Sequence, residues 1–106
     1  MRAGDLRHRV TIQQKSVTRD TYGAEVVSWT DVVTVWAEIT DLSGREYFDA
    51  QKVNAEVNTK VRIRHRTDLV PTMRVVEGSR TLEVLAVIDT DGRKRETVLM
   101  CKEVVD

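Results

Sequence analysis

The apolar and polar residues of this chain alternate with period two over much of its length, which is typical of half-buried β-strands. The stretch from His8 to Lys15 carries Val10 and Ile12 on one side and polar residues on the other. A second stretch, from Val57 to Arg66, alternates almost perfectly. Its core-facing positions are predicted to be Val57, Thr59, Val61, Ile63 and His65.

The run from Val26 to Ile39 also favours a strand, but it is longer than an ordinary strand and contains Asp31. We expect a bend or a β-bulge near Asp31. Trp29 and Trp36 are the large core candidates of this run.

Three further strands are predicted in the second half of the chain. Pro71 marks a break, because proline is unsuited to a central strand. The predicted strands are Met73 to Val76, Leu82 to Ile88 and Glu96 to Val105. The residues Glu77 to Arg80 predict a tight turn, and Asp91-Gly92 is the strongest hairpin signal in the sequence.

One stretch instead predicts a helix, from Ser43 to Glu56. Ser43 followed by Glu46 has the spacing of a capping box, in which the serine oxygen and the glutamate carboxylate each accept from the other residue's amide. Ala50 and Val53 are expected to face inward. The charged side is a candidate interface, made of Arg45, Asp49, Lys52 and Glu56.

These elements together predict one mainly β domain over residues 1–106. Its fold class is a small antiparallel β-barrel of six or seven strands, with one crossover helix covering an open end or a flank. A long hairpin loop is expected over residues 16–25, and residues 1–7 are expected to form a flexible arm.

The composition favours a globular, soluble protein and gives no general attraction to polyanions. Of 106 residues, 41% are hydrophobic and 32% are charged, and seventeen basic residues balance seventeen acidic ones. No signal peptide and no membrane span are expected, because no apolar run approaches the roughly 20 residues that a spanning helix needs. Cys101 lies in an apolar run, which predicts a buried, unreactive thiol.

The motifs of common catalytic and metal sites are absent from the sequence. It contains no P-loop, no G-x-G-x-x-G, no H-E-x-x-H and no G-x-S-x-G pattern. The only histidines, His8 and His65, have no cluster of further ligands near them in sequence. The carboxylates Asp89 and Asp91 fit a turn better than acid–base catalysis. We therefore expect no enzymatic activity, no metal and no cofactor.

One charge feature stands above the background. Four basic residues two apart share a face of the predicted strand: Lys60, Arg62, Arg64 and Arg66, here called the basic row. Pairing with carboxylates on a neighbouring strand would explain the row without any function. The alternative is a surface for a polyanion or an acidic partner, and a duplex backbone fits better than single strands because no aromatic residues interleave with the row.

The order of these features resembles the phage head–tail joining proteins, which are the head-completion or stopper proteins of long-tailed bacteriophages and their prophages. The start of the chain, Arg2 to Gln13, is similar to the pattern G-x-L-R-H-R-[VI]-x-[IL]-Q of that family. The resemblance continues in order through Asp20-Thr21-Tyr22-Gly23, Trp29, Val35 to Ile39, Leu42 to Glu46, Val61 to Arg66 and Leu82 to Asp89.

The resemblance implies a structural protein of the virion, assembled in the cytoplasm of the bacterial host. Such a protein docks as a ring below the portal and its adaptor, closes the DNA-filled capsid and provides the surface to which the tail attaches. Alone it is a monomer, and on the connector it forms a ring, twelve-fold by resemblance, through which double-stranded DNA passes. The basic row then faces this lumen or a neighbouring subunit, and the polar residues Asp20, Thr21, Tyr22 and Gly23 are a candidate docking loop.

Two alternatives stay open from the sequence. The chain could instead be a tail-terminator or tail-completion protein, which would bind the tail tube and not the capsid. It could also be a small barrel that binds nucleic acid directly as a monomer, through Arg62 and Arg64.

Overall fold

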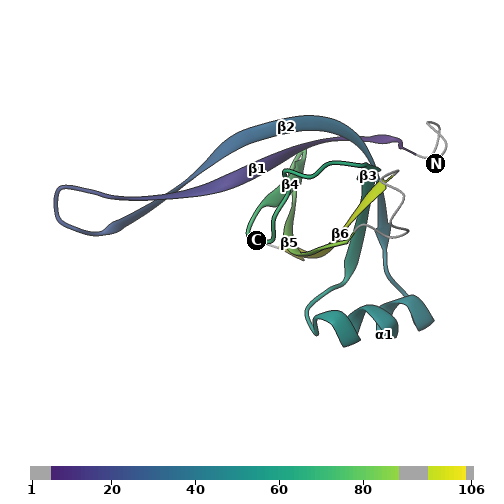
Figure 1. The fold of residues 1–106 in the computed structure, drawn as a ribbon. Coiled ribbons are helices and arrows are strands. Elements are labelled where there is room, and N and C mark those ends of the chain that lie inside the picture. Colours follow the sequence, from purple (N-terminus) through teal and green to yellow (C-terminus); the bar gives the residue numbers. More distant parts are fainter. Residues whose placement is uncertain (1–5, 89–95, 105–106) are drawn as a thin grey trace.

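The computed structural model describes residues 6–88 and 96–104, and Figure 1 shows how their elements are arranged. Within these residues the chain forms six strands and one helix. In chain order they are β1 (His8–Arg19), β2 (Glu25–Asp41), α1 (Gly44–Val53), β3 (Thr59–Arg64), β4 (Arg74–Glu77), β5 (Arg80–Ile88) and β6 (Glu96–Val104). The mainly β, antiparallel class predicted from the alternation is confirmed.

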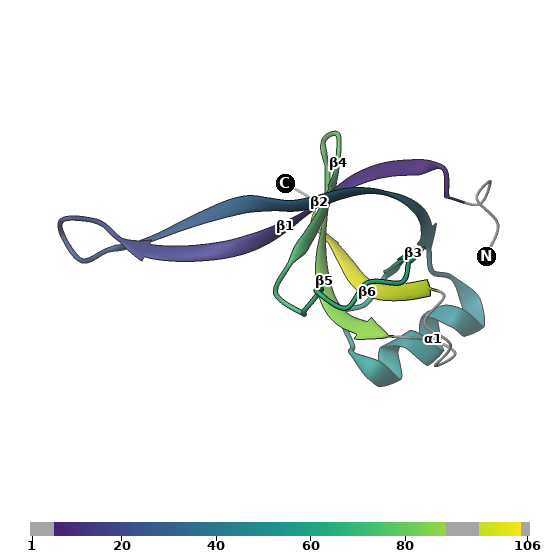
Figure 2. The ribbon, with the colours of Figure 1, turned by 45° about the horizontal axis from the view of Figure 1, so that its top comes forward.

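The six strands form one sheet that closes on itself. Their order is β1-β2-β3-β6-β5-β4, and β4 pairs with β1 as well as with β5. Every pairing is antiparallel. We call this part of the molecule the closed sheet, and Figure 2 shows it from a second direction.

The interior of the closed sheet is an apolar cluster to which all six strands contribute. The alternation in the sequence explains this directly, since residues two apart on a strand share a face. The predicted core positions Val10, Ile12, Val61 and Ile63 are all fully buried there. The rest of the buried cluster consists of Ala37, Leu69, Met73, Val75, Leu82, Val84, Leu99 and Cys101.

A second apolar cluster lies on the outer face of β6 and β5, where α1 covers them (Figure 1). Ala50 of α1 and Val57 pack against Val98 and Met100 of β6. Because Leu99 and Cys101 of the same strand face the interior, β6 is buried on both faces. The helix therefore covers a flank of the closed sheet.

The predicted role of the helix as a crossover is wrong. The strands on either side of it, β2 and β3, are antiparallel neighbours that pair from Ala37–Ile63 to Asp41–Thr59. The helix is thus inserted into the connection between two adjacent strands. The connection that does cross is the one from β3 to β4, since these strands are not paired with each other.

The helix is shorter than the predicted range 43–56. Ser43 is the N-cap, but its side chain makes no capping hydrogen bond, and Gly44 begins the helix at φ +56. Because the backbone of Gly44 is left-handed, the first helical turn does not have the geometry that a capping box needs. The helix ends at Val53 because Asn54 is extended and its side chain accepts from the amide of Glu56, which competes with helical bonding.

Of the two helix residues predicted to face inward, Ala50 and Val53, only Ala50 does so. Ala50 is buried, but Val53 is 58% exposed. A ten-residue helix that lies on the sheet through one small side chain buries a narrow stripe, and Val53 falls outside it.

The predicted long loop over residues 16–25 is also wrong. Ser16 to Arg19 belong to β1 and Glu25 to β2, and their pairing continues from Ser16–Ser28 to Arg19–Glu25. Only residues 20–24 form the turn. The result is a two-stranded ribbon that leaves the closed sheet and extends to the left in Figure 1, which gives the molecule a length of 48 Å against 27 Å in the other two directions.

The expected irregularity near Asp31 is present as a bulge. Ile12 pairs with Val33, while Gln13 pairs with Asp31, so Val32 is the extra residue. The strand continues past the bulge, and β2 is a single strand of 17 residues.

Trp29 and Trp36, predicted as core residues, both lie on the outer face of the sheet. Trp36 is next to Ala37, which faces the interior, so its own side chain points outward and is 50% exposed. Trp29 lies beyond the bulge, where the extra residue exchanges the two faces of β2. A cationic side chain lies over each indole: Arg9 at 5.3 Å from the ring centroid of Trp36 and Arg74 at 4.1 Å from that of Trp29.

Three other predictions concern the N-terminal end of the chain and two turns. The predicted turn at Glu77 to Arg80 is present, with Gly78 at φ +57, a conformation that glycine adopts without strain. Asp91-Gly92 and most of the predicted N-terminal arm lie outside the described residues. Within that arm, Leu6 is buried, so the arm does not extend to residue 7 as a free segment.

Substitution of a residue on the doubly buried strand tests this account of the core. Leu99→Ala removes a fully buried side chain and leaves a cavity inside the closed sheet. We expect the free energy of unfolding to fall by about 2–5 kcal/mol, measured by urea denaturation. Phe48→Ala is the matched control: that side chain is 69% exposed, and we expect a change below about 0.5 kcal/mol. Equal losses in the two variants would contradict the assignment.

Candidate assembly surfaces

The projecting hairpin, residues 14–30, is the most unusual surface of the molecule. Every residue in it is exposed except Trp29, which is partly buried. An isolated two-stranded hairpin is marginally stable in water. This one nevertheless exposes three valines to about half of their surface, namely Val17, Val26 and Val27.

The tip of the hairpin is held by Asp20. Its carboxylate oxygen Oδ1 accepts hydrogen bonds from the backbone amides of Tyr22 and Ala24, both at 2.9 Å. Gly23 adopts φ +80 and its carbonyl accepts from the guanidinium of Arg19 at 2.9 Å. Tyr22 is 94% exposed at the end of this ordered turn, so the predicted docking residues form a compact tip on a long stalk.

The two faces of the hairpin differ in chemistry. One continues the interior face of the closed sheet, but beyond Ile12 its apolar residues are replaced mostly by small polar ones. These are Gln14, Ser16, Thr18, Ser28 and Thr30. The other face carries cross-strand pairs: Gln13–Asp31, Lys15–Trp29, Val17–Val27 and Arg19–Glu25.

Contacts at its base fix the hairpin to the closed sheet. Gln13 donates to Asp31 through its amide nitrogen at 2.8 Å and accepts from Nε of Arg74 at 2.7 Å. Arg74 also stacks on Trp29. These contacts tie both strands of the hairpin to β4, so the direction of the ribbon is set by side chains as well as by the sheet.

The basic row is largely explained by neighbouring carboxylates. Arg62 lies opposite Glu38 on β2, with its Nη2 at 2.8 Å from Oε2 of Glu38, and its Nε is 3.7 Å from Glu96 on β6. Arg66 makes a bidentate contact with Asp68, and this hydrogen bonding lowers the pKa of Asp68 below its usual value. Within the described residues Lys60 and Arg64 form no ion pair, and Arg64 is the one member of the row that is exposed and not partly buried.

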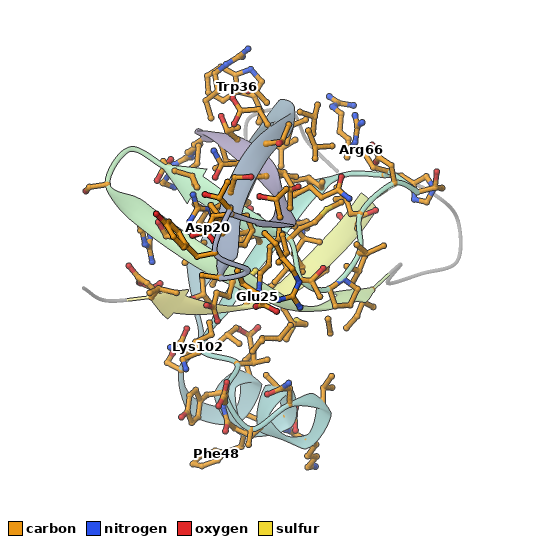
Figure 3. All side chains as sticks on the ribbon, turned by 90° about the vertical axis from the view of Figure 1, so that its left-hand side faces the viewer. Asp20, Glu25, Trp36, Phe48, Arg66 and Lys102 are labelled. Carbon is orange, nitrogen blue, oxygen red and sulfur yellow. The ribbon has the colours of Figure 1, made fainter. Side chains whose placement is uncertain are left out.

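The predicted helix interface is only partly available. Arg45, Asp49 and Lys52 are exposed, although Lys52 lies 3.7 Å from Asp49. Glu56 lies outside the helix and pairs with Lys102 of β6 at 3.6 Å. Figure 3 shows Phe48 on the outer side of the helix, where its ring meets the edge of Tyr47.

Sequence reasoning missed one exposed aromatic surface, around Trp36. In Figure 3 Trp36 lies at the opposite end of the molecule from Phe48. A cavity of about 330 Å³ beside it is lined by Leu6, Thr34, Val35, Trp36, Arg64, His65 and Arg66. The adjacency of Trp36 to Ala37 was a usable signal, because two neighbours on a strand cannot both face the interior.

The histidines and the cysteine are the remaining side chains that the sequence singled out for their chemistry. His8 contacts Glu77 at 2.7 Å, and no group of three or more metal-binding side chains occurs in the described part of the chain. The predicted burial of Cys101 is confirmed, and this burial raises the pKa of its thiol to about 12. Among the described helices, none is long and apolar enough to span a membrane.

Arg80, Asp41 and Glu103 form an ion-pair network on the closed sheet. Arg80 of β5 contacts Glu103 of β6 at 2.9 Å and Asp41 of β2 at 2.6 Å. The hydrogen bonds that Arg80 donates to Glu103 and to Asp41 raise the pKa of Arg80 above its usual value. This network links three strands, which fits a structural role.

Comparisons with known proteins agree over almost the whole chain. A family model described as phage head completion protein matches residues 1–104. Head completion protein gp7 of Enterobacteria phage HK97 is 34% identical over 90 residues, which are 83% of this chain and 80% of that protein.

Two solved structures share the fold. The solution structure of a protein from Shigella flexneri 2a has a TM-score of 0.74 and 30% identity, over 100% of this chain and 99% of that one. A chain of the virion of a native gene transfer agent particle has a TM-score of 0.63 and 20% identity, over 95% and 97% of the two chains. The second likeness is evidence for the fold alone.

The two arginines in the middle of the basic row should differ in their effect on stability. Arg62→Ala leaves two partly buried carboxylates, Glu38 and Glu96, without this partner, and we expect a loss of about 1–3 kcal/mol in urea denaturation. Arg64→Ala is the matched control at an exposed position and should change stability by less than about 0.5 kcal/mol. If Arg64→Ala is the more costly change, the assignment of Arg62 as the structural member of the row is wrong.

Proposed function

The chain belongs to the phage head completion protein family, and from this premise we propose that it docks as a ring below the portal and its adaptor, closes the DNA-filled capsid and provides the surface to which the tail attaches. Membership of the family makes the protein a structural component of the virion and not an enzyme. The match of the family model over residues 1–104 is the observation that carries the proposal.

The structure supplies surfaces that suit such a role. A subunit of a ring meets different surfaces on its two sides, and the exposed aromatic residues Trp36 and Phe48 lie at opposite ends of this molecule (Figure 3). The tip of the projecting hairpin, with Tyr22 at its end, is our candidate for docking to the portal or adaptor. The closed sheet acts as the small barrel from which these surfaces extend.

The helix and the basic row receive more specific roles in this proposal. Arg45, Asp49 and Lys52 on the outer side of α1 contact a neighbouring subunit or the tail protein, while Glu56 remains occupied by Lys102. Arg64 is the exposed member of the basic row that is able to meet the phosphate backbone of DNA passing through the lumen. Arg62 and Arg66 serve mainly to hold the sheet and its loop together.

Removal of the gene from its phage or prophage tests the proposal. We expect heads that package DNA but leak it and carry no tails, seen by electron microscopy of purified particles, and restored by supplying the chain in trans. Normal tailed virions in the absence of the chain would refute the proposal. Tails of abnormal length beside stable, filled heads would instead favour the tail-terminator alternative.

The nucleic-acid alternative makes a different prediction for the isolated chain. Because Arg62 and Arg66 are already paired, we expect no specific DNA binding by the monomer, and at most weak binding at low salt that falls as salt rises. Fluorescence anisotropy with a labelled duplex measures this, with Arg64→Ala as the variant and Lys52→Ala, an exposed lysine on the helix, as its control. Tight binding at physiological salt that only Arg64→Ala abolishes would favour the alternative.

A further inference from the structure

The projecting hairpin has two unpaired edges. Strand β1 pairs with β4 only from Thr11 to Gln13, so beyond that point no described strand lies along its outer edge. Strand β2 pairs with β3 only from Ala37 to Asp41, which leaves its own outer edge open over residues 25–36. Such edges present backbone amides and carbonyls that are ready to pair with another strand.

The charges of the two edges are opposite. In residues 14–19 of β1 the charged residues are Lys15 and Arg19, both basic. In residues 25–31 of β2 they are Glu25 and Asp31, both acidic. All four side chains lie on the same face of the ribbon, because Arg19 is opposite Glu25 and Gln13 is opposite Asp31.

This distribution selects one mode of pairing between copies. If β1 of one copy met β1 of another about a two-fold axis, Lys15 and Arg19 would face the same basic side chains, which is unfavourable for cross-strand neighbours. If β1 instead meets β2 of the next copy in the register that the two strands have within one chain, Arg19 faces Glu25, Lys15 faces Trp29, and no like charges are opposed. When the hairpins of a ring point the same way, these two strands also run antiparallel, as β1 and β2 do within one chain.

We propose that the projecting hairpins of neighbouring copies pair edge to edge, β1 of one copy with β2 of the next, in one continuous antiparallel sheet. This inference rests on the ring proposed above. Each hairpin pairs on both sides, so the contact is heterologous and closes only when the ring is complete. One face of the resulting sheet carries mainly hydroxyl and amide groups, and the other carries the charged pairs with Val17 and Val27 between them.

The pairing also accounts for the exposed valines and for the length of the ribbon. A two-stranded ribbon with no third strand gains little stability by itself, whereas three or more strands stabilise one another. The free chain has Val17 and Val27 opposite each other in the middle of the ribbon, both about half exposed. In the continuous sheet the same residues of the next copy lie beside them.

Disulfide trapping identifies the neighbours. Arg19→Cys and Glu25→Cys are made in separate chains with different tags, because the two positions are opposite each other within one chain. The chains are incorporated together into heads that lack the native protein, and the heads are oxidised. Cys101 does not compete, since its thiol is buried and its pKa is about 12.

We expect a mixed dimer of the two tagged chains, and no dimer from heads that contain either variant alone. Asp49→Cys is the matched control, because it also replaces an exposed carboxylate but lies on α1, and it should form no dimer with Arg19→Cys. A dimer of Arg19→Cys with itself, a disulfide to another virion protein, or heads that hold both variants without any disulfide would each overturn the proposal.

Hydrogen exchange on the unaltered chain provides a second, independent measurement. Amides that point outward from both edges, in residues 14–19 and 25–30, should exchange at least about tenfold more slowly in heads than in the free monomer. Amides of β6, which pairs on both sides in the free chain, serve as the internal reference. Unchanged exchange at the hairpin overturns the proposal. This measurement does not need the cysteine variants, so it decides the question even if one of them fails to enter heads. Slowed exchange on both edges then supports the pairing.

The two measurements separate this inference from the proposed function. If the unaltered chain is absent from heads, the head-completion role fails. If the chain is present but the mixed disulfide and the slowed exchange are both missing, the role stands and the pairing of hairpins is refuted.

Discussion

The burial of β6 on both faces is the constraint on which the rest of the structure depends. Leu99 and Cys101 complete the interior of the closed sheet, while Val98 and Met100 support the helix. Because residues next to each other on a strand point in opposite directions, one short apolar run joins two clusters. The helix is thereby fixed to the sheet through few contacts, and its outer side is left available.

Many charged side chains on the outer face of the closed sheet form ion pairs with one another. Arg62 of β3 pairs with Glu38 and Glu96 on its neighbouring strands β2 and β6. Arg80 of β5 pairs with Glu103 on the neighbouring strand β6 and with Asp41 at the end of β2, which is not a neighbour of β5. A balanced total charge therefore hides a local distinction. Charges on the closed sheet are mostly satisfied within the chain, whereas those of the projecting hairpin and the helix are more exposed to partners.

Alternation in the sequence predicted the strands and most of the interior, because a strand buried on one face has apolar residues at every second position, as at Val61 and Ile63. It could not predict the length of the hairpin. Residues 16–19 are polar except for Val17 because water reaches both faces, and such a strand has no apolar period to distinguish it from a loop. The tryptophans were misplaced for a related reason: size suggested burial, while their faces depend on Ala37 and on the bulge. The helix end at Asn54 depends on a local side-chain bond that composition does not reveal.

The bulge at Val32 changes which residues of β2 face the interior, the odd-numbered or the even-numbered ones. From Val33 to Ile39 the odd-numbered residues face the interior, but below Val32 the even-numbered residues continue that face. On β1 the even-numbered residues keep that face without interruption, so the extra residue shifts the alternation of β2 alone. The apolar and polar alternation of β2 therefore changes its phase at the point where the closed sheet ends and the projecting hairpin begins, while that of β1 continues unchanged.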